Sequence, residues 1–439
     1  MKKKLLLIYP PFCTPTNPPY SLFYLPAVIK ANSGFAVKVL DFNVIFHRKL
    51  VGDYFSTLNN YENQAEEFFK KSGKIYRKAN RLVRENKELP LLRDFVELVE
   101  KEKPDFIAFS CIYNQQIFYA SKIAEYFKGR IKTVIGGPAA SNHAKSCFDL
   151  VTDDLGSFAR FLGIQLAKWD FGVDYNCLDI SQYYTPKIVY PIRSSIGCCY
   201  AQCAFCNQHG FKNYFEFDIE QVAEQINTSN KMFFDFIDDA VPVDRLVKLK
   251  NYLNPGVRYL CYSRIDNNPS LDKFRKIHDS GCRLILWGVE SGSEKMLKLM
   301  NKGINLEGIE KTLYCSAKAG IKNSIYIIVG FPGETEETLK ETISFLKKNK
   351  ENIHLLCPNI FNVQPNSDVC KNPGRYGINR IIEKKRLYLP PSYNYKSDKY
   401  SHKEYIKLKA KYKKELESIN KYSTWFGVFK DHFLIKAGS

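Results

Sequence analysis

Short apolar runs alternate with helix-length stretches along most of this 439-residue chain. From residue 188 onward the apolar runs fall near 189–194, 233–238, 258–263, 283–288, 324–329 and 353–360. Helical stretches separate these runs near 218–229, 244–253, 270–280, 305–319 and 335–348. Continuous apolar runs are typical of strands buried on both faces, and strands joined by helices lie parallel with right-handed crossovers. The pattern predicts an α/β fold with a partial, open (β/α)6 barrel over residues 188–378, whose functional groups lie at the carboxyl ends of the strands.

A shorter alternation precedes the barrel. Apolar runs at 4–9, 36–40, 104–110 and 133–135, with helices near 22–31 and 116–128, predict a doubly wound Rossmann-like domain over residues 1–165. A charged helical insertion is expected at about 53–97 and a linker at 166–187. The tail, residues 379–439, is rich in Lys and Tyr and is predicted to be helical and basic. Within it, residues 405–419 have helical composition, and their charge favours a solvated helix face over a binding arm.

Charge and cysteine usage narrow the class of protein. With 65 Lys and Arg against 46 Asp and Glu, the net charge is +19, which favours an acidic partner such as nucleic acid, an acidic peptide, a phosphorylated ligand or anionic lipid. The 13 cysteines are an odd number and only four of them cluster, which argues against a secreted disulfide scaffold. The first apolar stretch is cut by two prolines and is too short for a secretory signal, and no run is long enough to span a membrane. We therefore expect a cytoplasmic protein.

The clustered cysteines carry the clearest chemistry. Cys199, Cys203 and Cys206 have CxxxCxxC spacing and follow the first barrel strand directly. Three thiolates on one short loop can bind three irons of a [4Fe–4S] cluster and leave the fourth iron open. A tetrahedral zinc site needs a fourth ligand, and His209 keeps that alternative open. Four inert buried cysteines are a third interpretation, which such dense clustering disfavours.

This loop resembles the hallmark of the radical S-adenosylmethionine (SAM) superfamily, in which an aromatic residue precedes the third cysteine, as Phe205 does here. The resemblance implies that the three spaced cysteines hold a [4Fe–4S] cluster. It also implies that the amino and carboxylate groups of SAM chelate the open iron and that Phe205 lies against the adenine. Cys198 is outside the spacing, so we treat it as a neighbour and not a ligand.

Later segments resemble the SAM-binding segments of the same superfamily in their order along the chain. They end the second to fifth barrel strands and lie at 236–240, 262–266, 288–292 and 330–335, the last two reading GVESG and GFPGET. The resemblance implies SAM contacts from Asp238, Ser263, Arg264, Glu290 and Gly330. Arg264 matches an arginine that many relatives direct at the SAM carboxylate, and a fork-shaped cationic donor suits that partner.

The N-terminal domain resembles the cobalamin (B12)-binding domain of one branch of this superfamily. The resemblance lies in segments 9–11, 39–41, 103–110 and 135–138. The chain lacks the Asp-x-His-x-x-Gly segment that would supply a histidine to cobalt, and Thr152-Asp153-Asp154-Leu155-Gly156-Ser157 replaces the usual GEGE turn. Cobalamin binding and a packing or docking role for this domain therefore both stay open.

By this resemblance, the reduced cluster cleaves SAM to a 5′-deoxyadenosyl radical that abstracts hydrogen from an unactivated carbon of a peptide or natural-product substrate. Cobalamin-dependent C-methylation would follow. The alternative is cobalamin-free epimerisation or rearrangement, with Cys357 or Cys370 as candidate hydrogen donors unless they are core residues. Modification of tRNA is a third possibility, and a non-catalytic cluster or zinc module is the least favoured. The resemblance also implies an electron donor such as flavodoxin or ferredoxin.

Overall fold

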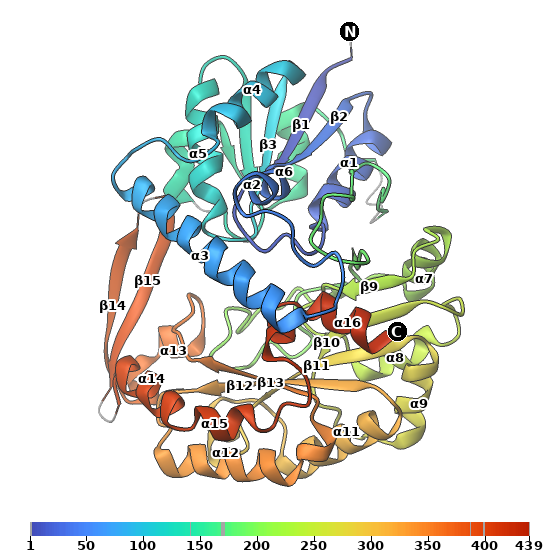
Figure 1. Cartoon of the computed structure of the whole chain (residues 1–439), viewed down its shortest axis with the longest axis vertical. Helices are drawn as coiled ribbons and strands as arrows, with labels where there is room; N and C mark the ends of the chain where they lie inside the picture. Colours follow the sequence, from blue (N-terminus) through green and yellow to red (C-terminus); the bar gives the residue numbers. More distant parts are fainter. Residues whose placement is uncertain (1, 141, 168–171, 387, 398–399, 439) are drawn as a thin grey trace. The chain divides into compact units, whose positions relative to one another are not determined.

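The computed structural model describes residues 2–140, 142–167, 172–386, 388–397 and 400–438, which form two compact units (Figure 1). The N-terminal unit comprises Met1–Ile188 and Lys385–Pro391, and the second unit comprises Val189–Lys384 and Ser392–Ser439. Both are built on parallel sheets, so the predicted α/β class is confirmed.

The N-terminal unit has one five-stranded parallel sheet. Its spatial order is β2 (Ala36–Asp41), β1 (Lys4–Tyr9), β3 (Phe106–Ser110), β4 (Lys132–Gly136) and β5 (Leu150–Val151). This 2-1-3-4-5 order is doubly wound, with its switch point between β1 and β3, where ligands of such sheets bind. The two-residue strand β5 was not predicted, because a run so short gives no periodic signal.

Successive residues of β1 face two different cores, as the pleat of a strand requires. Leu6 and Ile8 pack toward α2 (Phe42–Leu50), α4 (Leu92–Glu102) and α5 (Gln116–Phe127). Leu5 and Leu7 pack toward α1 (Ser21–Asn32) and α6 (Leu155–Leu162). Helices therefore cover both faces of the sheet, which explains the unbroken apolar sequence of the strand.

The expected helical insertion is α3 (Tyr61–Arg84), a 24-residue amphipathic helix. The following helix α4 is also amphipathic: Phe95, Val96 and Val99 on one side of it are buried in the core. A short 3₁₀ turn, η1 (Asn142–Cys147), precedes β5.

Residues 168–171 of the predicted linker lie outside the described residues. The described remainder of 166–187 has no helix or strand and is bound to the N-terminal unit. The backbone amide of Asp174 donates to Phe23 and that of Tyr184 to Pro15, at 3.1 and 2.8 Å between nitrogen and oxygen. The Tyr183 hydroxyl donates to the Asp41 carboxylate. This segment is thus part of the first unit's surface.

The second unit is an open six-stranded parallel sheet. Its spatial order is β6 (Tyr190–Ile192), β9 (Phe233–Phe236), β10 (Arg258–Ser263), β11 (Cys282–Glu290), β12 (Lys322–Val329) and β13 (Leu355–Ile360). The crossover helices are α7 (Ile219–Thr228), α8 (Val243–Leu249), α9 (Leu271–Asp279), α11 (Leu306–Lys318) and α12 (Glu336–Lys348). The sheet order follows the chain order from one edge to the other, as in a partial (β/α)6 barrel.

Shorter elements complete this unit and were not predicted. They are β7 (Ser195–Ile196), β8 (Phe215–Glu216), α10 (Glu294–Leu299), η2 (Lys350–Asn352), α13 (Asp368–Lys371) and η3 (Pro373–Tyr376).

The prediction of an all-helical tail is wrong for its first part. β14 (Ile378–Arg386) and β15 (Leu389–Ser397) form a two-stranded sheet. Pro390 and Pro391 exclude a helix interior, and Tyr393 and Tyr395 alternate with polar residues at the period of a strand. The helices α14 (His402–Lys411), α15 (Lys413–Glu417) and α16 (Lys430–Gly438), with the 3₁₀ turn η4 (Thr424–Gly427), follow.

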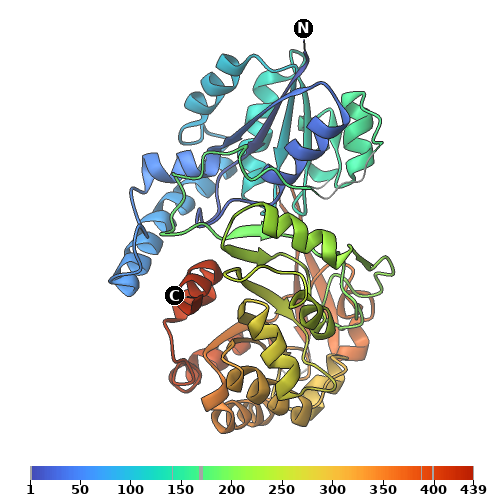
Figure 2. The same ribbon diagram turned by 90° about the vertical axis from the view of Figure 1, so that its right-hand side faces the viewer.

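The last helix, α16, is largely buried. Figures 1 and 2 show α16 beside the sheet, on the side that α9 and α11 leave uncovered, and it contacts β9, β10 and β11. His432 and Phe433 are fully buried, and Lys430 Nζ lies 2.9 Å from the carboxylate of Asp235 in β9. Apolar packing and this ion pair explain why a Lys-rich sequence ends inside the unit. In the described part of the chain, no helix is long and apolar enough to cross a membrane.

Candidate functional site

The cysteine loop lies at the carboxyl end of β6, at the same edge of the sheet where the other parallel strands end. Antiparallel pairing of β7 with β8 closes the loop at its base. The pairing joins Ser195 to Glu216 and Ile196 to Phe215, so residues 197–214 project as one excursion. Gly197 begins this excursion. Its φ is +80°, a conformation that favours glycine, and the Phe211 ring approaches closely where a side chain would begin.

Two buried charged residues hold the base of this loop. Asp238 accepts hydrogen bonds from the Ser194 amide at 3.0 Å, from the Ser194 hydroxyl at 3.0 Å and from the Ser195 hydroxyl. Arg245 donates to the Ser194 carbonyl at 2.9 Å and to the Phe217 carbonyl. Asp238 therefore braces the loop from below, and its oxygens are occupied within the protein. A SAM contact from this residue stays a prediction.

The next residue, Asp239, was passed over in the sequence and is the carboxylate nearer the cysteines. Its Oδ2 lies 3.4 Å from Gln208 Nε2 in the cysteine loop. Burial raises the pKa of the Cys206 thiol, and the charge of Asp239 raises it further. Successive side chains of an extended segment point to opposite sides, so the sequence could have identified Asp239 as facing away from Asp238.

A tight turn at residues 300–303 holds the other side of the loop. The Met300 carbonyl accepts from the Ala204 amide at 2.8 Å, and Asn301 Nδ2 donates to the Gln202 carbonyl at 2.9 Å. The Tyr200 hydroxyl donates to the Asn301 carbonyl at 2.9 Å. Gly303 is required here, because a Cβ on it would lie 2.5 Å from that hydroxyl oxygen. The turn and the loop are thus joined by three separate hydrogen bonds.

Arg264, at the end of β10, is fixed between the loop and this turn. Its guanidinium carbon lies 3.7 Å from the centroid of the Tyr200 ring, and Nη2 donates to the Lys302 carbonyl at 2.7 Å. Its Nη1 lies 3.9 Å from Cys203 Sγ. Stacking and bidentate donation are what distinguish arginine from lysine at such a position. The structure therefore brings this predicted site residue against a predicted cluster ligand.

Glu290, at the end of β11, forms an ion pair with Lys302, whose Nζ lies 2.9 Å from Glu290 Oε1. The pairing register with β12 shifts between Gly288 and Glu290, and Glu290 has a φ of +69°, so a bulge re-aims its side chain. Gly288 provides the space: a Cβ there would lie 2.6 Å from Glu290 Oε1 and 2.9 Å from Lys302 Nζ. Lys302 was not identified in the sequence.

The neighbouring thiols Cys198 and Cys199 interact with each other. Interaction with the neighbouring thiol lowers the pKa of Cys198 to about 5 and raises the pKa of Cys199. Cys203 is buried, which raises the pKa of its thiol, while Lys302 and Arg264 act in the opposite direction. Among the described residues, no three His, Cys, Asp or Glu side chains gather where one metal ion would bind. The choice of Cys199 over Cys198 as a ligand stays a prediction.

His209, the alternative zinc ligand, faces α13. Its Nε2 lies 4.0 Å from Asp368 Oδ1, and Tyr376 and Asn372 donate to the same carboxylate. Its Nδ1 is buried and has no hydrogen-bond partner among the residues that the structure describes. A buried, unpaired ring nitrogen beside the cysteine loop is consistent with a group bound there.

Two further predicted SAM contacts have backbone or side-chain partners of their own. The Ser263 hydroxyl donates to the Val241 carbonyl at 2.7 Å. Gly330 has a φ of +86° beneath the Tyr405 ring, its amide donates to Glu334, and its carbonyl accepts from the Tyr395 hydroxyl. Phe205 is half-buried, with Lys302 Nζ 5.8 Å from its ring centroid. Their roles toward SAM stay predictions.

The two candidate hydrogen donors differ in their surroundings. Cys357 lies within β13, with Sγ 3.8 Å from the Ser324 hydroxyl and only 2.8 Å from where a Cβ on Gly427 would be. Cys370 lies on α13, and the amide of the preceding residue, Val369, donates to the Ala204 carbonyl of the cysteine loop at 3.1 Å. The structure thus brings the segment of Cys370, and not that of Cys357, against the loop.

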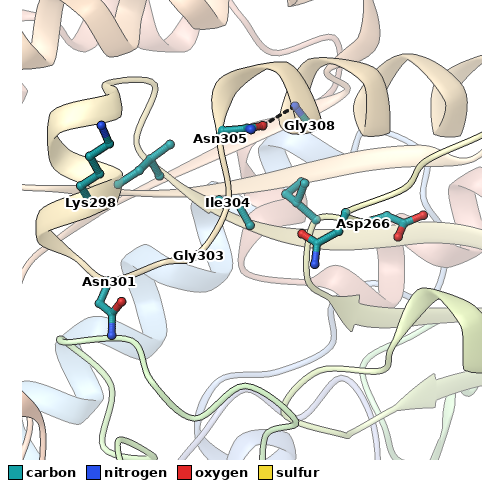
Figure 3. Close-up of a pocket in the computed structure, with 10 residues that line it drawn as sticks. Asp266, Lys298, Asn301, Gly303, Ile304, Asn305 and Gly308 are labelled. Carbon is teal, nitrogen blue, oxygen red and sulfur yellow. Dashed lines mark hydrogen bonds between the residues drawn. The ribbon is translucent and has the colours of Figure 1, made fainter.

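A cavity of about 460 Å³ lies on the outer side of the 300–303 turn (Figure 3). Asp266, from the loop after β10, and Lys298 line it, as do Asn301 and Gly303 of the turn. The Asn305 side chain accepts from the Gly308 amide at 2.8 Å and so caps α11 at the cavity wall. The same turn therefore contacts the cysteine loop on one side and this cavity on the other.

The sequence and fold of this second unit match those of known proteins. Residues 194–346 match the family described as the radical SAM superfamily. These residues form a radical SAM domain. The chain is also similar to an uncharacterized methyltransferase, PH0819, of Pyrococcus horikoshii, with 25% identity over 190 residues. That match covers 40% of this chain and 40% of the relative, so it spans less than half of either protein.

Two solved structures are similar in fold over most of this chain. The first is the cobalamin-dependent SAM radical enzyme OxsB, with aqua-cobalamin and SAM bound; its TM-score is 0.63, and the match covers 93% of this chain and 66% of OxsB. The second is the radical SAM methyltransferase TsrM from Kitasatospora setae, with tryptophan and a SAM analogue bound; its TM-score is 0.56, with 84% and 75% covered. Both are 14% identical in sequence, so the likeness is one of fold.

Replacing Arg245 tests whether the base of the loop matters for the site. We expect Arg245→Met to weaken retention of iron by about 10- to 100-fold, because groups that orient metal ligands contribute about that much. The measurement is the rate of iron loss to a chelator after anaerobic reconstitution. The matched control is Arg275→Met on the exposed face of α9. Equal rates in the two variants would contradict a bracing role for Arg245.

Proposed function

We propose that this protein is a cobalamin-dependent radical SAM methyltransferase that modifies an unactivated carbon of a peptide or natural-product substrate. One observation carries the proposal: two cations that follow two neighbouring barrel strands lie beside the predicted cluster loop, one next to a buried cysteine and one near the aromatic residue of the motif. Cys203 is beside Arg264 after β10, and Lys302 is held by Glu290 at the end of β11. Anionic cluster ligands and the carboxylate of SAM both suit such a setting.

The residues of the loop suit a [4Fe–4S] cluster and SAM. Cys199, Cys203 and Cys206 would hold the cluster, while Arg264 and Asp239 face the same space from two strand ends. When bound, the cluster supplies the electron that splits SAM, and cobalamin supplies a transferable methyl group. The protein's part is to orient SAM by its charged ends and to keep water from the reacting carbon.

The N-terminal unit suits cobalamin at the carboxyl edge of its sheet. Gly137 approaches β3 so closely that a Cβ would lie 2.6 Å from the Cys111 carbonyl oxygen, and its φ is +101°. Directly after β3, the large apolar residues Ile112 and Tyr113 are 37% and 51% exposed. A tight glycine turn beside exposed apolar side chains at a sheet switch point is a surface that a flat cofactor would cover.

No histidine follows β1 directly that could bind the cobalt of a cobalamin. The residues after that strand are Pro10, Pro11, Phe12 and Cys13, and His47 on the adjacent helix α2 is buried against the Asn43 carbonyl and the Tyr76 hydroxyl. We therefore propose that any cobalamin bound here is held without a protein imidazole on the metal.

A second candidate function is cobalamin-free hydrogen return to a substrate radical. The position of α13 favours it, since the residue before Cys370 is hydrogen bonded to the cysteine loop. Modification of tRNA is a third, weaker candidate that rests on the net charge of +19. In each case we expect an electron donor of the flavodoxin or ferredoxin class and action in the cytoplasm.

Anaerobic reconstitution with iron, sulfide and hydroxocobalamin tests the proposal. After desalting, we expect about four irons for each chain, stoichiometric cobalt, and an absorption spectrum with both chromophores. A cluster without cobalt would overturn methyl transfer and favour the hydrogen-return alternative. Iron below one equivalent, or zinc in its place, would overturn the radical SAM assignment of the loop itself.

A further inference from the structure

Lys302 is a buried cation that the SAM and cluster motifs do not include. It is 5% exposed, and its partner Glu290 is 8% exposed. Within the part of the chain that the structure describes, its ammonium donates one hydrogen bond, to Glu290 Oε1, although an ammonium has three N–H donors. Its Nζ also lies 5.8 Å from the ring centroid of Phe205, the aromatic residue of the cysteine motif, so the charge is held beside the cysteine loop.

The fold gives up stability to place this pair. Gly288 leaves the pair its space and Glu290 adopts a left-handed backbone conformation. A conformation of this kind is strained in a residue other than glycine. A buried ion pair also contributes little net stability compared with apolar side chains of the same volume. The strained backbone and the buried ion pair together suggest that the positive charge of Lys302 has a function.

We infer that Lys302 is a positioning residue for the iron–sulfur site: its buried positive charge, held in place by Glu290, raises the reduction potential of the cluster that Cys203 helps to bind. This inference rests on the proposed function, because it requires a cluster at the cysteine loop. It assigns to Lys302 an electrostatic role and no contact with the reacting carbon.

The direction follows from Coulomb's law. Reduction adds one electron to the cluster, so a nearby positive charge stabilises the reduced state and a nearby negative charge destabilises it. Both cations, Lys302 and Arg264, act on Cys203 more strongly than Glu290 does. Burial lowers the pKa of Lys302, but Glu290 and Cys203 raise it above its usual value overall, so the side chain is charged at neutral pH.

The two members of the pair therefore have opposite predicted effects. Lys302→Met removes the positive charge and is expected to lower the potential. Glu290→Gln leaves the lysine without its counter-charge and is expected to raise the potential. At a fixed potential, each variant should change the ratio of reduced to oxidised cluster by about tenfold, in opposite directions. A merely structural pair would give the same loss in both variants.

The test uses the full chain, reconstituted with iron and sulfide and measured without SAM. The midpoint potential is read by dye-mediated titration followed by electron paramagnetic resonance. Lys298→Met is the matched control, because Lys298 lies on α10 and lines the outer cavity. Lys302→Arg, which keeps the charge, serves if the methionine variant fails to assemble a cluster; its potential should stay close to that of the unaltered protein while Glu290→Gln still raises it.

Shifts of the same sign in Lys302→Met and Glu290→Gln, or no shift beyond that of Lys298→Met, would overturn the inference. Failure of the unaltered protein to assemble a cluster gives a different result, since it removes the proposed function before any variant is compared. The two failures are therefore distinguishable in one series of samples.

Discussion

Replacing Cys203 by Ala is expected to abolish cluster assembly and to reduce SAM cleavage to the background rate. Of the three spaced cysteines it is the buried one, and it is 3.9 Å from Arg264 Nη1. Without its thiolate, no described cysteine on the loop is placed beside both cations. The measurement is iron and sulfide content after anaerobic reconstitution, followed by 5′-deoxyadenosine production with a chemical reductant.

Cys198 and Cys199 provide the matched pair for the same experiment. The two thiols are adjacent in the chain and electrostatically coupled, so only the CxxxCxxC spacing distinguishes them as candidate ligands. We expect Cys199→Ala and Cys206→Ala to lose the cluster and Cys198→Ala to keep it. Loss in Cys198→Ala with retention in Cys199→Ala would show that the ligand set begins one residue earlier.

The sequence predicted the two sheets well because their strands are parallel. A strand covered by helices on both faces needs unbroken apolar sequence, as in Leu5-Leu6-Leu7-Ile8, and such runs are readily identified. The order of the barrel strands in space is their order in the chain, so a right-handed β/α repeat was sufficient to predict the topology.

The hairpin β14–β15 and the burial of helix α16 were not predicted, for a common physical reason. Their Lys- and Tyr-rich sequences depend on tertiary partners, such as Gly330 for Tyr395 and Asp235 for Lys430. Lys and Tyr side chains are amphipathic, but composition alone does not show which surface their apolar parts cover.

In the candidate site, too, local sequence patterns were sufficient for some residues, whereas others depend on distant partners. Residues in local motifs, such as the cysteines and Glu290, were found because their spacing is short. Lys302 and Arg245 were missed because each acts through residues 12 or more positions away, Lys302 through Glu290 and Arg245 through Ser194. The turn glycine Gly303, following Lys302, was the available signal for a close approach at this point.

Gly137→Ala is expected to destabilise the N-terminal unit by about 3 kcal/mol or more, since a side chain there adopts a left-handed conformation and also meets backbone. Its φ is +101°, and a Cβ would lie 2.6 Å from the Cys111 carbonyl oxygen, which accepts a hydrogen bond from the Ala139 amide at 3.1 Å. For a unit of this size, the expected fall in melting temperature is about 6–12 °C. Movement of the turn should also reduce the cobalt retained after loading with hydroxocobalamin.

Gly129→Ala isolates the backbone contribution to this effect. Gly129 belongs to the same unit and has a φ of +76°, but nothing lies within 4 Å of where its Cβ would be. It should therefore cost only the left-handed penalty of about 1–2 kcal/mol and leave cobalt retention unchanged. Thermal unfolding followed by circular dichroism, with cobalt content measured on the same preparations, separates the two contributions. Equal melting temperatures for the two variants would show that β3 yields to the added methyl group. Normal cobalt retention in a destabilised Gly137→Ala would place any cobalamin away from this turn.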